Sequence, residues 1–271
     1  MNCPICSAKL SSTGIKNKIF NSDSYYCNAC HSYHILDKID DSEYYAEKYH
    51  TAFNYKKIVS AIINKLGLVS NRCISRYRYI KKHVRFSSKM SYLEIGGGSG
   101  ENFVIYNARK KPELYTIIEP NSKFNLKNKK LRYFNDIFEN ISTEKLIGTN
   151  VVMIFHVLEH IYDLEIFFEK LKNVNPQYFY FEVPNIDNKI VLDDSLKNHP
   201  HYHHFSIKSI DYMLNKQGFT KIALDGIDPK SYHPYKKIGT FKRYLKRILG
   251  KNESFNDKGL YIRGIYQIKE K

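Results

Sequence analysis

Short, unbroken apolar segments that alternate with helical stretches constrain this sequence most. Four of them occur beyond position 89, at Tyr92–Ile95, Tyr115–Ile118, Val151–Phe155 and Tyr178–Phe181. Strands that are apolar on both faces are typical of a parallel sheet with helices on both sides. Two later segments, 220–224 and 260–268, alternate more and are expected to close the sheet's edge as an antiparallel pair. The sequence therefore predicts a doubly wound α/β domain.

A glycine-rich turn, Gly96-Gly97-Gly98-Ser99-Gly100, follows the first of these strands, and a helical pattern resumes at Glu101. Glycines at such a turn let the backbone approach a ligand closely, at the sheet edge where doubly wound folds bind ligands. The dinucleotide pattern G-x-G-x-x-G is incomplete, because Glu101 or Phe103 occupies the third glycine position, and the phosphate-binding G-x-x-x-x-G-K-[ST] is absent. The neighbouring acid Glu94 favours a cationic ligand without phosphates, and S-adenosylmethionine fits through its sulfonium and ammonium groups.

Residues after the next two strands complete the predicted cofactor pocket. Glu119-Pro120 lies about twenty residues beyond the loop, where a carboxylate accepts hydrogen bonds from ribose hydroxyls. Asp136-Ile137 follows the third expected strand and suits an adenine edge, the carboxylate for the amino group and the aliphatic side chain for the ring. An ordinary helix cap is the alternative role for Asp136.

Four of the five cysteines form two C-x-x-C pairs separated by a 20-residue loop: Cys3 with Cys6, and Cys27 with Cys30. This spacing is typical of a structural zinc site, since each pair holds the metal from a tight turn and four thiolates close the shell. Two disulfides are the alternative, which a reducing compartment disfavours. Residues 1–38 are therefore expected to form a zinc ribbon that needs its metal to fold.

The remaining chain divides into two parts. Residues 39–89 carry apolar side chains three and four positions apart, which predicts a helical segment. Residues 90–271 hold the sheet domain, with a basic insertion at about 228–258. A helix in that insertion would present on one face Phe241, Tyr244, Leu245 and Ile248. The 43 Lys and Arg residues against 27 Asp and Glu residues give a net charge of +16, which favours anionic partners.

The loop and its strands resemble the class I S-adenosylmethionine-dependent methyltransferases, whose first motif is E-x-G-x-G-x-G. Four residues match that motif in full: Glu94, Gly96, Gly98 and Gly100. The resemblance covers about residues 90–271 and implies a seven-stranded sheet of order 3-2-1-4-5-7-6 with strand seven antiparallel. It also implies cofactor contacts from Glu119, Asp136, Phe155 and His156. With its N-terminal cysteine pairs, the chain looks like the sugar methyltransferases of bacterial deoxysugar and surface-polysaccharide pathways.

His156-Val157-Leu158-Glu159-His160 follows the fourth expected strand. It formally matches the H-x-x-E-H of inverted zinc proteases, but its place after a buried strand at the ligand edge argues against a protease. Some similar methyltransferases, of the ubiquinone pathway and of small RNAs, bind a divalent cation with E-x-x-E-H at this position. A cation at Glu159 and His160 is therefore one interpretation. The sequence favours the other, in which His156 lines the cofactor site and Glu159 and His160 lie in a helix's first turn.

Four histidines gather in six positions after the fifth strand, just before Ser206, which is expected to begin a capped helix. Methyl transfer requires an acceptor atom held in line with the methyl carbon and a base that removes a proton. Histidine can accept that proton at neutral pH. The predicted base is His203 or His204, with His156 near the sulfonium; a solvated histidine-rich loop is the alternative.

These features together predict a methyltransferase that acts on a sugar, nucleotide-sugar or glycan acceptor in bacterial surface-glycan synthesis. An RNA methyltransferase is the alternative enzyme, but the stretch from Cys3 to Cys30 carries only Lys9, Lys16 and Lys18 and no arginine, which disfavours nucleic acid. A third possibility is a non-catalytic protein in which a zinc ribbon is attached to a methyltransferase core. The intact glycine motif disfavours this alternative. Without a readable signal or membrane span, we expect a cytoplasmic protein whose basic helix can rest on the anionic inner membrane surface.

Overall fold

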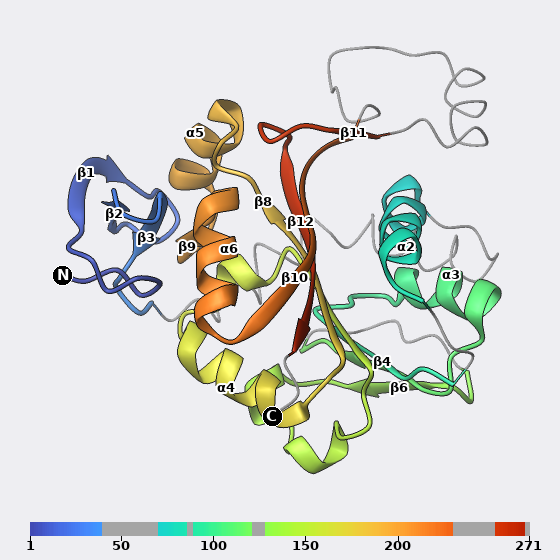
Figure 1. The fold of residues 1–271 in the computed structure, drawn as a ribbon. Coiled ribbons are helices and arrows are strands. Elements are labelled where there is room, and N and C mark those ends of the chain that lie inside the picture. The colour runs from blue at the N-terminus through green and yellow to red at the C-terminus, as the bar shows by residue number, and fades with distance from the viewer. Residues whose placement is uncertain (40–69, 86–88, 121–127, 230–252, 269–271) are drawn as a thin grey trace.

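The computed structural model describes residues 1–39, 70–85, 89–120, 128–229 and 253–268 (Figure 1). The predicted basic helix at 241–248 and most of the predicted helical segment at 39–89 lie outside these residues. Within that segment, α2 spans Asn71–His83, in agreement with the helical prediction. Among the described helices, none combines the length and apolar character needed to span a bilayer.

An eight-stranded sheet forms the centre of the molecule (Figure 1). Its first five strands are parallel: β4 (Tyr92–Ile95), β5 (Tyr115–Ile118), β6 (Leu131–Phe134), β7 (Val151–Phe155) and β8 (Tyr178–Pro184). The later strands are β10 (Phe219–Pro229), β11 (Glu253–Phe255) and β12 (Tyr261–Ile268). The sheet order is β11-β10-β12-β8-β7-β4-β5-β6, and β12 is antiparallel to both neighbours. This is the predicted order 3-2-1-4-5-7-6 with one short edge strand, β11, that the sequence did not predict.

Helices cover both faces of the sheet, as the unbroken apolar strands require. On one face lie α2 and α3 (Glu101–Lys110), and on the other α4 (Leu164–Val174) and α6 (Ile207–Lys216) (Figure 1). Alternate side chains of a strand point to opposite faces. Leu93 of β4 accordingly belongs to the buried cluster with Phe167 and Phe168, whereas Tyr92 belongs to the cluster with Tyr106 and Tyr115.

Side-chain caps fix where the helices begin. Asp163 accepts a hydrogen bond from the Ile166 backbone N–H at the start of α4, and Asn188 caps α5 (Lys189–Asn198) in the same way. Ser206 and Ser209 form a reciprocal capping box at α6, which confirms the predicted helix start. Three 3-10 turns, Phe138–Asn140, Thr143–Lys145 and Leu158–His160, lie in the loops after β6 and β7.

The N-terminal ribbon has three strands of its own, β1 (Ser11–Lys16), β2 (Asp23–Cys27) and β3 (Ser32–Ile35). A fourth strand, β9 (His203–His204), comes from far along the chain and pairs with β3. The Asn17 side chain also donates hydrogen bonds of 2.8 Å to the carbonyl oxygens of Leu196 and His199. The ribbon is therefore completed and held by residues of the sheet domain.

Candidate active site

The glycine loop is shaped by close packing beneath it. Gly96 has a φ of +72°, and a Cβ there would lie 2.3 Å from a Val157 methyl carbon. A Cβ on Gly97 would lie 2.8 Å from Ile117, so this glycine is also required. Gly98, with φ +52°, has open space where its Cβ would be. The loop therefore presses its backbone against the sheet at Gly96 and Gly97 and leaves Gly98 facing outward.

Glu94 supports this loop from below. Its two carboxylate oxygens accept hydrogen bonds from Asn102 Nδ2 at 2.5 Å and from the Tyr115 hydroxyl at 2.7 Å. Burial raises the pKa of Glu94 to about 6, against the opposing effect of these two hydrogen bonds. The structure thus places Glu94 as the link between β4, β5 and the first turn of α3.

Glu119 lies directly at the loop. Its Oε2 accepts a hydrogen bond of 3.0 Å from the Gly98 backbone N–H. Because β4 and β5 are adjacent and parallel, their carboxyl ends meet at one edge, and Glu119 leaves β5 at that edge. The neighbouring Pro120 is exposed. Two residues predicted from separate motifs, Gly98 and Glu119, are therefore in direct contact.

Asp136 and Ile137 follow β6 at the same edge. Asp136 Oδ1 accepts hydrogen bonds of 2.8 Å from the Ile137 backbone N–H and from Asn140 Nδ2, so it organises its own turn. Ile137, which follows the half-buried strand β6, is 47% exposed. The turn leaves an aliphatic surface next to the strand that carries Glu119.

A buried ionic cluster lies on the other side of the loop, at the carboxyl end of β8. Glu182 is fully buried, and Arg76 Nη2 and Arg263 Nε donate to its two oxygens at 2.7 and 2.8 Å. Arg72 Nε donates at 3.0 Å. Burial alone would raise the pKa of Glu182, but Arg76, Arg263 and Arg72 together hold it well below its ordinary value.

Sequence reasoning missed this cluster, although signals for it exist. Glu182 interrupts an otherwise apolar strand, and Arg263 does the same in β12. Arg72 and Arg76 stand four positions apart on α2, which places them on one helix face. Only the tertiary fold brings the three elements to one point.

His156 joins the two halves of this edge. It follows β7 with a φ of +58°, and its Nε2 contacts Arg72 Nη2 and, at 3.1 Å, Glu182 Oε1. Its Nδ1 lies 3.4 Å from Glu159 Oε1. The preceding residue, Phe155, is buried and lies under the guanidinium of Arg76, 4.1 Å from the ring centroid. Of the pair predicted to contact the cofactor, only His156 is partly exposed, at 24% of its side chain.

Glu159, His160 and His201 form a second cluster behind His156. One ligand atom from each lies within 4.8 Å of the others. Glu159 is 1% exposed, and neither of its carboxylate oxygens has a hydrogen-bond partner within the described part of the chain. The Nδ1 atoms of the histidines are engaged, by the Pro200 carbonyl for His160 and by the Ser195 hydroxyl for His201, both at 2.8 Å. Three side chains that can bind a metal ion therefore converge behind His156.

The prediction that His203 or His204 is the catalytic base is corrected. Both are 2% exposed in β9, where they pair with the ribbon. His203 uses both ring nitrogens, Nδ1 to His34 Nδ1 at 2.9 Å and Nε2 to the Tyr162 carbonyl at 3.1 Å. Burial, followed by the neighbouring His34, lowers the pKa of His203 to about 3, so the ring is neutral. Together with His204, whose Nδ1 contacts the Ser195 hydroxyl, it joins the ribbon to the sheet domain.

The four predicted zinc ligands come together in the ribbon. The sulfur atoms of Cys3 and Cys30 are 3.6 Å apart, those of Cys6 and Cys27 are 3.4 Å apart, and all four lie within 4.8 Å of one another. Sulfurs about 2.3 Å from one zinc ion in a tetrahedron lie about 3.8 Å from each other. The cysteines are free thiols rather than disulfides, so the arrangement fits a tetrahedral metal ion.

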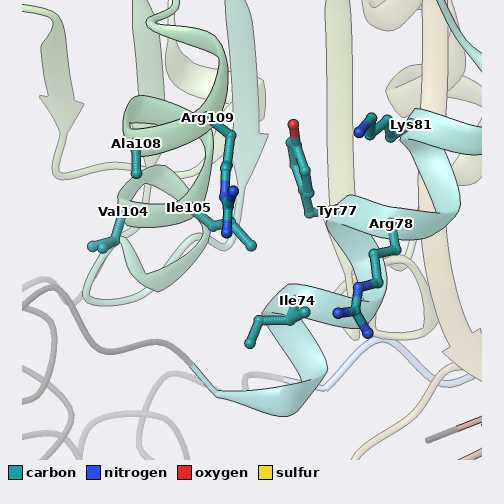
Figure 2. A pocket seen from close by; sticks show the side chains of 8 residues that line it. All are labelled: Ile74, Tyr77, Arg78, Lys81, Val104, Ile105, Ala108 and Arg109. Atoms are coloured by element: carbon teal, nitrogen blue, oxygen red, sulfur yellow. The ribbon is translucent and has the colours of Figure 1, made fainter. Parts of the chain in front are cut away.

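A separate pocket of about 410 Å³ lies between α2 and α3, lined by Ile74, Tyr77, Arg78, Lys81, Val104, Ile105, Ala108 and Arg109. Figure 2 shows Tyr77 and Arg109 pointing into the space between the two helices. None of the predicted site residues lines this pocket. It is therefore distinct from the edge that carries the glycine loop, Glu119 and His156.

Residues 72–224 match the sequence profile of a family described as a methyltransferase domain, which is more than half of the chain. The chain belongs to this methyltransferase family. The match includes the glycine loop, Glu119, His156 and the Glu159 cluster. No curated protein matches the sequence. The prediction of an S-adenosylmethionine-dependent methyltransferase with an α/β fold is thereby confirmed at the level of family and fold.

Solved structures show the same fold at low sequence identity. The methyltransferase resembles a SAM-dependent methyltransferase of Thermotoga maritima, with TM-score 0.52, 12% identity, and 84% of this chain and 97% of that chain covered. It is also similar to a Listeria monocytogenes protein named as an S-adenosylmethionine-dependent methyltransferase, with TM-score 0.51, 16% identity, and 73% and 99% covered. The small RNA methyltransferase HEN1 gives TM-score 0.51 and 16% identity over 72% of this chain and 25% of that one. These likenesses concern the fold and leave the acceptor open.

Proposed function

We propose that this methyltransferase transfers a methyl group from S-adenosylmethionine to a sugar or sugar-linked acceptor of a bacterial surface glycan. The observation that carries the donor assignment is the contact between Glu119 and the Gly98 N–H beside the open side of the loop. A carboxylate at this point can accept from ribose hydroxyls while the glycine backbone approaches the ligand. Asp136 and Ile137 would hold the adenine, one strand further along.

The order of the strands then sets the direction of the donor. If adenosine lies over β5 and β6, the strand order would place the methionine part at the glycine loop after β4 and its sulfur toward β7 and β8. S-adenosylmethionine supplies an electrophilic methyl carbon, and the chain has to hold the acceptor in line with it and receive a proton. His156, which lies at the end of β7 and is partly exposed, is the candidate residue for contacting the acceptor.

The support for a sugar acceptor is the sequence resemblance noted above: two cysteine pairs precede a methyltransferase motif, as in the bacterial sugar methyltransferases. Transfer of label from S-[methyl-³H]adenosylmethionine to nucleotide-sugar pools, with no transfer to total RNA, is the expected result. RNA is the second candidate acceptor, favoured by the net charge of +16. Label in RNA alone would replace the glycan proposal by the RNA proposal.

Donor binding gives a direct test of the pocket. Glu119→Gln removes a charged acceptor worth about 1.5–3 kcal/mol, so binding of S-adenosylmethionine should weaken about 10- to 100-fold in calorimetry. Gly98→Arg should abolish binding, because the new side chain would fill the open side of the loop. The exposed carboxylate Glu165 on α4 is the matched control, and Glu165→Gln should bind normally. Equal affinity in all three variants would refute the assigned pocket.

We also propose a divalent cation at Glu159, His160 and His201. Burial of the Glu159 carboxylate is costly, and a cation bound to it would reduce that cost. Two imidazoles and one carboxylate suit zinc or iron better than magnesium, which prefers oxygen ligands. A bound cation would supply positive charge beside the acceptor, next to His156.

Zinc counting tests this second metal. Atomic emission on zinc-saturated protein should give two ions per chain, one in the ribbon and one at Glu159. Glu159→Gln should lower the count to one, and Glu169→Gln, at an exposed position of α4, should leave it at two. A count that is the same for both variants would contradict the Glu159 site.

A further inference from the structure

We propose that the acceptor carries an anionic group, a phosphate or a carboxylate, and that the guanidinium of Arg72 binds it. This inference rests on the methyltransferase function proposed above and specifies the acceptor side of that site. Three arginines, Arg72, Arg76 and Arg263, donate to a single buried carboxylate, Glu182. The described cluster therefore holds more positive than negative charge.

The three arginines differ in how far their hydrogen bonds are satisfied. Arg263 is 1% exposed; it donates to Glu182 through Nε and Nη2 and to the Ser75 hydroxyl through Nη1. Arg76 is 10% exposed, donates through Nε and Nη2 to Glu182, and lies against the ring of Phe155. Both side chains are enclosed. They serve to anchor Glu182 rather than to meet a ligand.

Arg72 is different. Its side chain is 35% exposed, and only its Nε donates to Glu182. Its guanidinium lies 4.8 Å from the centre of the Tyr261 ring and touches His156. A guanidinium has five N–H donors in a planar fork that matches phosphate and carboxylate oxygens. Arg72 is thus an oriented cation with donors left for a ligand.

Arg72 lies on the acceptor side of the proposed active site. Tyr261 begins β12 opposite Pro184, the last residue of β8, so Arg72, Tyr261 and His156 meet at the carboxyl ends of β7 and β8. Glu119, which is assigned to the donor, follows β5 on the other side of β4. An acceptor that approaches the donor's sulfur from the β8 side has to pass Arg72. A negatively charged group on the acceptor would be attracted to the partly exposed Arg72 guanidinium, whereas a neutral acceptor would not.

Small anions without a sugar separate this inference from the glycan proposal. Phenyl phosphate and benzoate, with phenol as the neutral control, are titrated by calorimetry into protein saturated with S-adenosylhomocysteine. We expect binding of at least one of the two anions and no binding of phenol. Preference between phosphate and carboxylate identifies the anionic group. Arg72→Gln should weaken this binding at least tenfold, and Arg72→Lys should retain part of it.

The matched control is Arg78→Gln, which removes an exposed cation from the same helix on the side of the α2–α3 pocket. Anion binding should be unchanged in this variant, and all variants should bind S-adenosylhomocysteine and melt as the wild type does. Equal losses in the Arg72 and Arg78 variants, equal binding of phenol, or no anion binding would overturn the proposal. A loss of S-adenosylhomocysteine affinity in Arg72→Gln would assign Arg72 to the donor instead. Failure to methylate sugars would leave this result intact.

Discussion

Glu182→Gln should lower the free energy of unfolding by about 3–5 kcal/mol, because removal of one partner leaves buried charges uncompensated. Glutamine keeps the shape of the side chain but not its charge. Arg76 and Arg263, which are 10% and 1% exposed, would then face each other without their shared counterion. Urea unfolding followed by circular dichroism measures the change, with Glu165→Gln as an exposed control expected to change stability by less than about 0.5 kcal/mol.

The pH dependence of this effect has a defined sign. The pKa of Glu182 is held well below its ordinary value in the folded protein by Arg76, Arg263 and Arg72, which outweigh the effect of burial. Its contribution is therefore present above the unfolded pKa of about 4.3 and is lost as pH falls through the lower folded pKa. The difference between wild type and Glu182→Gln should be full at pH 7 and shrink below about pH 4. A difference that stays constant down to pH 3 would contradict the ion-pair explanation.

Cys27→Ser should remove zinc from the ribbon and unfold residues 1–38. Binding of structural zinc contributes on the order of 10 kcal/mol or more to small domains, which have little core of their own. Because β9 completes the ribbon sheet, the loss should extend to the segment around His203 and His204. Hydrogen exchange of β3 and β9, together with metal analysis, measures both consequences.

Cys73→Ser is the control for this prediction. Cys73 is equally buried, at 2% exposure, but lies on α2 outside the four-cysteine cluster. Its replacement should leave the zinc content and the protection of β9 unchanged. An unchanged metal content in Cys27→Ser would refute the zinc proposal. Protection of β9 in the absence of metal would show that the ribbon stays folded without zinc.

Much of the fold follows from local pattern. The segments at 92–95, 115–118 and 151–155 are apolar at every position or nearly so, and only a sheet covered on both faces buries such strands completely. The edge strand of the sheet is harder to predict from sequence, because β11 has three residues and takes its place only by pairing with the end of β10. Short edge strands carry too little pattern to be recognised in sequence.

Site residues on neighbouring strand ends can be predicted from sequence, whereas those placed by contacts between distant segments cannot. Gly98 and Glu119 lie on consecutive strand ends, so their contact follows from the order of neighbouring parallel strands. His203 and His204 were assigned to the acceptor site because histidines gather there in sequence. The tertiary structure pairs their strand with the ribbon instead, where β3 is 169 positions away from its partner at the His34–His203 contact.

The sequence by itself determined the α/β sheet, the glycine loop with its acidic partner, and the grouping of four cysteines, because each depends on residues near one another in the chain or on adjacent strands. The tertiary structure alone decided that Arg72, Glu182 and Arg263 share one buried cluster and that Glu159 meets His201. The physical reason is that a buried charge is stable only beside its partner, and the partners here come from elements that meet through packing of the whole domain.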